Sequence, residues 1–434
     1  MTRSAKNHQH KYPSKGARSD GPCPIMRSCG GCEWLGLPYR KQLARKHAAM
    51  VELFGPLIES FGWDVTVEPV LGMGESRKSG PVTTADAPLA APRAFRYKAA
   101  TPFAPGGERQ GDVRSGFFAR GTHEIVPCPS CAVEAPRTRE LLNEVARACE
   151  RLGIPAYDED RGTGQMRYAV VRAGWRTDEF MLTLVTRSRE VPHLDELIEV
   201  LHAYEPRLVT IAQNINPRRT NAILGGETRL LYGEPRMTDM LLGCTFEISP
   251  TSFYQVNPQQ TEVLYQLAID GMDAHEGDVL LDTYCGSGTI GLCAADALRT
   301  AGNRVQLIGV ERNVEGVRDA RRNAEINGLG EDAPVSARFV AQDATAYMKA
   351  RAAEGAKVDV LIMDPPRAGS TPEFLTATAA LAPRRIVYIS CNPTTQVRDL
   401  ELLGRARYRL LRISPVDMFP HTTHVETVAV LERS

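Results

Sequence analysis

The sequence predicts an α/β protein that ends in a doubly wound, mainly parallel sheet. This sheet is expected within 246–434, after a mixed α/β central region at 63–245 and a small cysteine-rich segment at 23–62. Two observations support the prediction. From about residue 246, short apolar runs rich in Val, Ile and Leu alternate with helical stretches, which is the pattern of βαβ units. In the central region, strand-like and helical stretches occur without that regular alternation.

The bulk composition is that of an ordinary globular protein. The chain has 434 residues, of which 43% are hydrophobic and 24% charged, enough for two or three domains. No apolar run approaches the ~20 residues of a membrane-spanning helix. The polar N-terminus lacks the apolar stretch of a secretory signal. We therefore expect a cytoplasmic, monomeric protein without a membrane partner.

Charge is balanced overall but unevenly distributed. The chain contains 52 Lys and Arg and 52 Asp and Glu, so its formal net charge is zero. Residues 1–50 hold ten of the basic residues and only two of the acidic ones. A basic arm on a neutral protein is compatible with contact to nucleic-acid phosphates. We expect 1–22 to be a disordered basic arm that acts as a loose electrostatic tether.

A single helix is expected to follow the N-terminal cysteines. Leu43, Met50 and Phe54 belong to a set of residues that recurs at three- and four-residue steps, the spacing of one helix face. The pair Gly55-Pro56 is expected to interrupt or end this helix, because proline removes a backbone donor.

The central region is expected to start with a mobile loop at 72–92, which is rich in Gly, Pro and Ala. Strand-like stretches at 95–103 and 115–126 follow, and then a helix from about Arg137 to Leu152. Two alternating stretches, MRYAVVRAGW and FMLTLVTR, are typical of a β-hairpin. This region contains no catalytic motif that we can name.

The C-terminal region contains the strands that are expected to build the parallel sheet. Their carboxyl ends should meet at one edge, where ligands bind in open α/β sheets. The apolar runs that define these strands lie at 279–282, 305–311, 358–364, 386–391 and 425–432.

The first of these strands leads into a glycine turn. LLDTYCGSGTIGL places Gly286 and Gly288 between a strand and a helix, where they allow close approach to a ligand. A short G-x-G alone fits an NAD site or a simple tight turn equally well. The next strand ends in Glu311, which suits a ribose diol, and the third is followed by Asp343, which suits an adenine edge. With these two carboxylates placed after successive strands, a nucleoside-bearing cofactor is favoured over a dinucleotide.

Potential reactive groups follow the last strands. Asp364-Pro365-Pro366-Arg367 is expected to form a rigid loop. An aromatic residue after Asp/Asn-Pro-Pro is typical of amino-group methyltransferases, and Arg367 argues against that chemistry. A cysteine at a strand end is often a small packing residue. The position of Cys391 at the ligand-binding edge favours a nucleophile instead. Glu426, at the start of the last strand, could act as a base.

Together these motifs resemble those of the RNA uridine-C5 methyltransferases, the family that forms 5-methyluridine in transfer and ribosomal RNA. The matching segments run through 249–434 in the family's order. The resemblance implies a Rossmann-like domain that uses S-adenosyl-L-methionine (SAM), preceded by a central RNA-binding domain. The segments are SPTSFYQVNPQQTEVLY, LLDTYCGSGTIGL, GVERNVEGVRDARRNAEING, DPPRAG, YISCNPTT and MFPHTTHVETVAVL.

The resemblance also implies a covalent mechanism. Cys391 would attack C6 of the uracil, C5 would then take the methyl group, and Glu426 would remove the C5 proton before Cys391 is released. Thr289 stands where the family often has Asn, so we expect modestly changed cofactor contacts. The implied cofactor-binding residues are Gln255, Tyr284, Glu311, Asp343 and Asp364.

The N-terminal cysteines have the spacing of a metal site. Cys23, Cys29 and Cys32 lie on a short glycine-containing loop and suit zinc or an iron–sulfur cluster, between which spacing cannot choose. The resemblance favours a [4Fe–4S] cluster with Cys131 as the fourth ligand. Cys128, which is followed directly by proline, stays an alternative, and reduced, unligated cysteines are the other possibility.

RNA is the partner that the resemblance implies. Family members often carry an N-terminal β-barrel RNA-binding domain, and only 22 residues precede Cys23 here, so we expect that barrel to be missing. Its absence favours 23S ribosomal RNA over transfer RNA. RNA contacts would then come from the basic N-terminal residues and the central region. Candidate residues there are Arg96, Lys98, Arg167 and Arg172.

Three alternatives stay open. They are the same chemistry on transfer RNA, methylation of another acceptor such as cytosine C5, and a non-catalytic iron–sulfur protein that binds RNA. Related cytosine enzymes usually carry a cysteine after the Asp-x-Pro motif, where this chain has Arg367, so uracil is favoured. The presence of both Cys391 and Glu426 argues against a silent protein.

Overall fold

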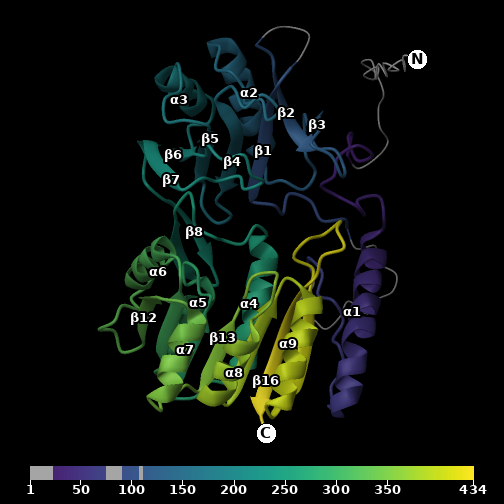
Figure 1. The fold of residues 1–434 in the computed structure, drawn as a ribbon, viewed down its shortest axis with the longest axis vertical. Coiled ribbons are helices and arrows are strands. Elements are labelled where there is room, and N and C mark those ends of the chain that lie inside the picture. Colours follow the sequence, from purple (N-terminus) through teal and green to yellow (C-terminus); the bar gives the residue numbers. More distant parts are fainter. Residues whose placement is uncertain (1–22, 75–89, 107–110) are drawn as a thin grey trace, which may run out of the picture.

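The computed structural model describes residues 23–74, 90–106 and 111–434. Two lobes lie one above the other in Figure 1, each built on its own sheet. The basic arm expected at 1–22 and most of the loop expected at 72–92 lie outside the described residues. Among those that are described, no helix is both long and apolar enough to cross a membrane.

The lower lobe contains the predicted parallel sheet. From one edge to the other, its strand order is β12-β11-β10-β13-β14-β16-β15. The first five strands are parallel, and β16 is antiparallel to both of its neighbours. The predicted doubly wound fold is therefore confirmed. The strands are β10 (Val279–Thr283), β11 (Gln306–Glu311), β12 (Ser336–Ala341), β13 (Val360–Met363), β14 (Arg385–Ser390), β15 (Tyr408–Val416) and β16 (Glu426–Arg433).

Helices cover both faces of this sheet. One hydrophobic core joins it to α4 (Pro258–Met272), α5 (Thr289–Thr300) and α6 (Val314–Ile326). Another joins its opposite face to the N-terminal helix and to α7 (Ala344–Ala353), α8 (Pro372–Leu381) and α9 (Pro393–Arg405). Polar caps begin several of these helices, each accepting a bond from a free backbone N–H, worth about 1 kcal/mol. The capping residues are Asn257, Asn313, Asp343 and Thr371.

The upper lobe is a mixed sheet with helices on one face. Its order is β3-β2-β1-β4-β5-β6-β7, and α2 (Thr138–Leu152) and α3 (Leu194–Tyr204) share a hydrophobic core with it. The predicted helix and the hairpin of β4 and β5 are confirmed. The strands are β1 (Lys98–Pro105), β2 (Val113–Phe118), β3 (Ile125–Pro127), β4 (Met166–Ala173), β5 (Phe180–Thr186), β6 (Leu208–Ile215) and β7 (Glu227–Gly233).

One stretch in this lobe differs from the prediction. The run at 115–126 is not one strand but the end of β2, a turn and the start of β3, which pair antiparallel. Gly121 has φ +71° in the turn, a conformation that glycine adopts readily. A further hairpin of β8 (Met237–Leu241) and β9 (Cys244–Ile248) leads into the lower lobe.

The expected end of the N-terminal helix at Gly55-Pro56 is wrong. Helix α1 (Tyr39–Phe61) continues through Pro56 for five more residues. Proline inside a helix costs about 3 kcal/mol relative to alanine. Leu57 and Ile58, which follow it, are buried in the core against the lower sheet, and each such side chain contributes about 1.5–3 kcal/mol. Tertiary packing therefore offsets the local cost.

Candidate active site

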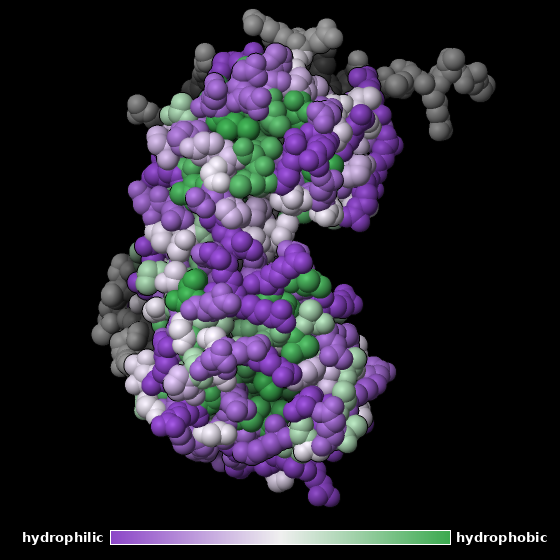
Figure 2. All heavy atoms as spheres, turned by 90° about the vertical axis from the view of Figure 1, so that its left-hand side faces the viewer, coloured by the Kyte–Doolittle hydropathy of each residue, from purple (hydrophilic) through white to green (hydrophobic). Residues whose placement is uncertain are grey.

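The predicted site residues gather at the carboxyl edge of the lower sheet. Tyr284 follows β10, Glu311 ends β11, Asp364 follows β13 and Cys391 follows β14. Parallel pairing places the ends of these strands side by side. This edge faces the upper lobe in Figure 1, and Figure 2 shows a hollow between the two lobes. Chemistry at this edge would therefore occur where both lobes can contact one substrate.

The structure brings Cys391 and Glu426 together. Ser390 of β14 pairs with Thr427 of the antiparallel β16, so the next residues in register, Cys391 and Glu426, lie opposite each other at the strand ends. The thiol is half-buried, whereas the carboxyl residue is only 4% exposed. A nucleophile and a base can thus reach one small substrate.

Burial makes these groups hold their protons. It raises the pKa of Glu426 to about 8, with a further contribution from Asp364. It also raises the pKa of Asp364 to about 7. The pKa of the Cys391 thiol is raised by burial and by these two carboxyls, while Arg367 lowers it. Near neutral pH, the site therefore contains a neutral thiol and a largely protonated Glu426.

The glycine turn and Glu311 form the wall of a cavity. The backbone N–H of Gly286 donates to Oε2 of Glu311 at 3.2 Å, and that of Asn313 donates to Oε1 at 2.8 Å. Gly288 has φ +80°, and a Cβ there would lie 3.0 Å from the ring of Phe339. Glycine at 288 therefore lets the turn pack closely against β12, and two backbone N–H groups hold the carboxylate of Glu311 at the cavity wall. The cavity is lined by Thr251, Ser252, Phe253, Gly286, Ser287, Glu311, Asn313, Glu315, Gly316 and Asp319.

The other predicted cofactor residues lie around this cavity and do not line it. Gln255 is buried in the loop before α4. Tyr284 is half-buried in a left-handed conformation (φ 62°), and burial raises its pKa to about 12. Asp343 is exposed and caps α7 through a bond from the N–H of Ala346, 3.0 Å long.

Sequence reasoning missed part of this wall. Phe253, Ser287 and Asn313 line the cavity, and all three lie in motifs that the sequence had already singled out. The hydroxyl of Thr289 contacts the buried Tyr265 hydroxyl at 2.8 Å, so it is engaged in the protein core. Asp282 is also structural here, because its Oδ2 accepts from the N–H of Gly291 at 3.1 Å.

A second cavity lies among cysteines, between the N-terminal segment and the upper lobe. It has a volume of about 280 Å³, compared with ~30 Å³ for one water in the liquid. Among the residues that the structure describes, no three metal-binding side chains lie close enough to hold a single ion. The thiols lining the cavity belong to Cys23, Cys29, Cys32, Cys128 and Cys131.

Two of these thiols differ in their surroundings. Cys128 is buried, and its Sγ donates to the carbonyl of Ser130 at 3.3 Å. Cys131 is only partly buried, and a hydrogen bond from Cys128 lowers its pKa. For Cys32, burial raises the pKa to about 12. Soft sulfur donors of this kind match iron or zinc.

Some basic residues of the upper lobe bond to the protein itself, and others are candidates for contact with RNA. Arg167 is buried and donates to the carbonyl of Asn216 at 2.7 Å. Arg172 is also buried, and it donates to the carbonyl of Tyr254 at 3.2 Å, so it ties β4 to the loop that carries Gln255. These two arginines are not free to contact RNA.

Lys98 is available. It faces Arg172 across the pairing of β1 and β4, and no carboxylate of the described chain forms an ion pair with its ammonium. Burial, with the charges of Arg172 and Arg96, lowers its pKa to about 8. Arg96 is exposed nearby and uses one N–H on the carbonyl of Lys98. An anion at this point would relieve the repulsion among these cations.

Comparison with known proteins adds three similarities. A family model described as tRNA (Uracil-5-)-methyltransferase matches residues 243–434. An uncharacterized RNA methyltransferase of Bacillus cereus is 37% identical over 96% of this chain and 84% of its own length. One from Staphylococcus aureus is 37% identical over 94% of this chain and 83% of its own length.

A solved structure is similar to this chain over both lobes. The Pyrococcus abyssi tRNA (uracil-54, C5)-methyltransferase in complex with S-adenosyl-L-homocysteine superposes with a TM-score of 0.69 and 26% sequence identity. The match covers 92% of this chain and 85% of that chain, so it includes both lobes.

Proposed function

The chain belongs to the RNA methyltransferases of the tRNA (uracil-5-)-methyltransferase family, and from that premise we propose that it methylates C5 of a uridine in RNA. The observation that carries the proposal is the placement of the Cys391 thiol beside the buried carboxyl of Glu426. C5 of uracil is a poor nucleophile until a thiolate adds to C6. A thiol and a base at one point are what this chemistry needs.

In the proposed reaction, Cys391 adds as a thiolate to C6, and the electron pair of the C5–C6 bond becomes available at C5. Bound SAM would supply the methyl group as an electrophilic sulfonium. Glu426 then takes the proton from C5, the C6–S bond breaks, and Cys391 leaves as a thiolate. Gln255, Tyr284 and Glu311 would hold SAM, together with Asp343 and Asp364.

We propose 23S ribosomal RNA as the substrate. Transfer RNA is the second candidate, which the Pyrococcus abyssi relative favours, since its description names uracil-54 of tRNA. The residues 63–245 would bind the RNA and 246–434 would carry the chemistry, in a cytoplasmic monomer. Lys98, which lies beside Arg172 and Arg96, would contact a phosphate.

A covalent trap tests the reaction. The protein is incubated with SAM and either ribosomal or transfer RNA that contains 5-fluorouridine. Fluorine cannot leave as a proton, so the methylated adduct should stay attached to Cys391 and survive denaturation. The adduct should form with wild type and with Cys149→Ala, a buried cysteine of the upper lobe. It should vanish in Cys391→Ala, and mapping it would identify the RNA.

If no adduct forms, the fate of the RNA distinguishes the two alternative functions. Methyl transfer to RNA without any adduct, with 5-methylcytidine in the nucleoside digest, would establish the cytosine alternative. RNA binding without methyl transfer would establish a non-catalytic protein.

We also propose that Cys23, Cys29, Cys32 and Cys131 hold a [4Fe–4S] cluster. Support comes from the shared cavity, its size and its sulfur donors. Such a cluster would cross-link the N-terminal segment to the upper lobe. Iron and sulfide content after anaerobic purification tests it, with Cys131→Ser expected to lose the cluster and Cys128→Ser to retain it. The reverse result would make Cys128 the ligand.

A further inference from the structure

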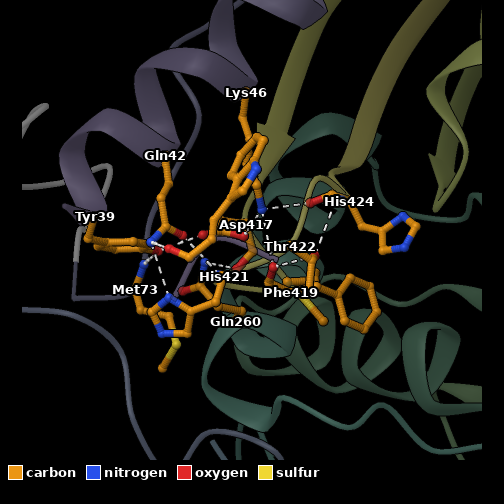
Figure 3. A network of polar contacts seen from close by, with 12 residues as sticks. Tyr39, Gln42, Lys46, Met73, Gln260, Asp417, Phe419, His421, Thr422 and His424 are labelled. Atoms are coloured by element: carbon orange, nitrogen blue, oxygen red, sulfur yellow. Dashed lines mark hydrogen bonds and ion pairs between the residues drawn. The ribbon is translucent and has the colours of Figure 1, made fainter. Parts of the chain in front are cut away.

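Helix α1 presents a row of polar side chains to the protein interior. Tyr39, Gln42 and Lys46 are spaced three and four residues apart, so they lie on one face of the helix. All three are buried. They contact the segment 417–424, which connects β15 to β16 (Figure 3). Buried polar groups require partners, and this segment supplies them.

Lys46 is the centre of these contacts. Its Nζ lies 2.5 Å from Oδ1 of Asp417, and both side chains are fully buried. The same ammonium donates to the carbonyls of His424 at 2.7 Å and Phe419 at 3.2 Å. An ammonium has three donors, so all of them are used. Oδ2 of Asp417 accepts from the hydroxyl of Tyr39 at 2.8 Å, so both carboxylate oxygens are held as well.

Gln42 extends the network toward the cysteines. Its Oε1 accepts from the backbone N–H of His421 at 2.9 Å. The carbonyl of His421 in turn accepts from the N–H groups of Glu33 and Trp34, both at 2.9 Å. These two residues directly follow Cys32. The segment 417–424 is thus fixed at its start, middle and end by the N-terminal part of the chain.

This segment leads directly to Glu426. Lys46 binds the carbonyl of His424, two residues before the base. Among the described residues, no hydrogen bond or ion pair holds the carboxyl of Glu426 itself. Its position therefore depends on packing and on the backbone that enters β16. A change of a few tenths of an ångström in that backbone would move the base relative to the uracil.

We propose that Lys46 and Asp417 are positioning residues for Glu426, which set the rate of proton removal from C5 and release of the RNA. The proposal rests on the reaction proposed above. Adduct formation and methyl transfer depend on Cys391 and SAM, whereas only the final elimination depends on Glu426. Loss of the buried ion pair should therefore slow the last step selectively, so that the methylated adduct accumulates on ordinary, unfluorinated RNA.

The experiment compares adduct formation with product release in single turnovers of the full-length protein. In Lys46→Met, release of 5-methyluridine-containing RNA should slow about tenfold or more, with the ~10²–10⁴-fold contribution of a fully positioned base as the upper limit. The rate of adduct formation should stay within about threefold of wild type. A tenfold loss of that rate would correspond to ~1.4 kcal/mol of activation free energy and would mean that the first step is affected as well. Lys46→Arg, which retains a cation, should restore part of the release rate.

Arg385→Met is the matched control. Arg385 is a buried cation that pairs with Asp273 at 2.9 Å, and it lies at the opposite end of β14 from Cys391. This variant should lose stability without accumulating adduct. If Lys46→Met does not fold, the double variant K46M/D417L takes its place, because apolar groups can replace a buried ion pair without leaving an unpaired charge.

Two results would overturn the proposal. One is release at the wild-type rate from a folded Lys46 variant. The other is an equal loss of adduct formation and release, which would indicate a general structural role. Failure of the underlying reaction looks different, since wild type itself would then form no adduct with 5-fluorouridine RNA.

Discussion

At the scale of single residues, the site is built to keep its acids protonated until substrate arrives. Glu426, Asp364 and Cys391 all have raised pKa values because they are buried close together. A bound sulfonium would bring a positive charge to this cluster and favour its ionised forms. The ionisation of these three groups would therefore be coupled to the binding of SAM.

This arrangement predicts how stability depends on pH. The pKa of Glu426 rises from 4.5 to about 8 in the fold, so the folded protein binds this proton more tightly than the unfolded chain. The resulting stabilisation is complete below pH 4.5 and is lost as pH rises toward 8. The glutamine in Glu426→Gln cannot ionise. The melting temperature of this variant relative to that of wild type should therefore rise between pH 5 and pH 8, by at least about 2 °C.

Thermal unfolding without SAM at both pH values measures this. Glu401→Gln serves as the control because Glu401 lies on α9 away from the site and forms an exposed ion pair with Arg405. A constant difference between Glu426→Gln and wild type at the two pH values would show that Glu426 ionises normally in the fold.

Single residues also show what the sequence could and could not reveal. The positions of Cys391 and Glu311 were predictable because each lies at the carboxyl end of a short apolar strand, and such ends meet at one edge. Glu426 was singled out as a carboxylate at the start of the last strand. The pair Lys46–Asp417 was not predictable, since its members lie 371 positions apart. Pairings of that kind are created only by the folded chain.

At the scale of elements, packing decides where local signals conflict. The strands of the lower sheet were predictable from runs of Val, Ile and Leu that are buried on both faces. Strand β15 was missed because YRLLRISPV mixes arginines with apolar residues, as expected for a strand at the sheet edge. Helix α1 was cut short in the prediction because Pro56 is a strong local signal that core contacts override.

Helix α1 therefore offers a stability prediction. Pro56 is exposed, so replacing it with alanine restores a backbone donor without disturbing the core. Pro56→Ala should stabilise the protein by about 1–3 kcal/mol, measured by urea unfolding. Gly55→Ala is the companion variant, with about 1 kcal/mol expected, because its new Cβ would meet no atom within 4 Å. A destabilised Pro56→Ala would mean that the proline ring itself packs.

At the scale of the whole molecule, the two lobes enclose the hollow where RNA is proposed to bind. Lys98 should contribute one phosphate contact there. Lys98→Gln should weaken RNA binding and make the slope of log affinity against log salt concentration less steep by about one. Lys349→Gln, on the exposed side of α7, is the charge-matched control. Equal slopes for both variants would remove Lys98 from the RNA interface.

The contact between α1 and the segment 417–424 also constrains how the protein is made. Lys46 is synthesised 371 residues before Asp417, which at ~5–20 residues per second is a delay of roughly 20–70 s. During that time the polar row of α1 has no partner, and the base has not yet been translated. The contacts between α1 and the segment 417–424 therefore cannot form until that segment, among the last parts of the chain to be translated, has been made.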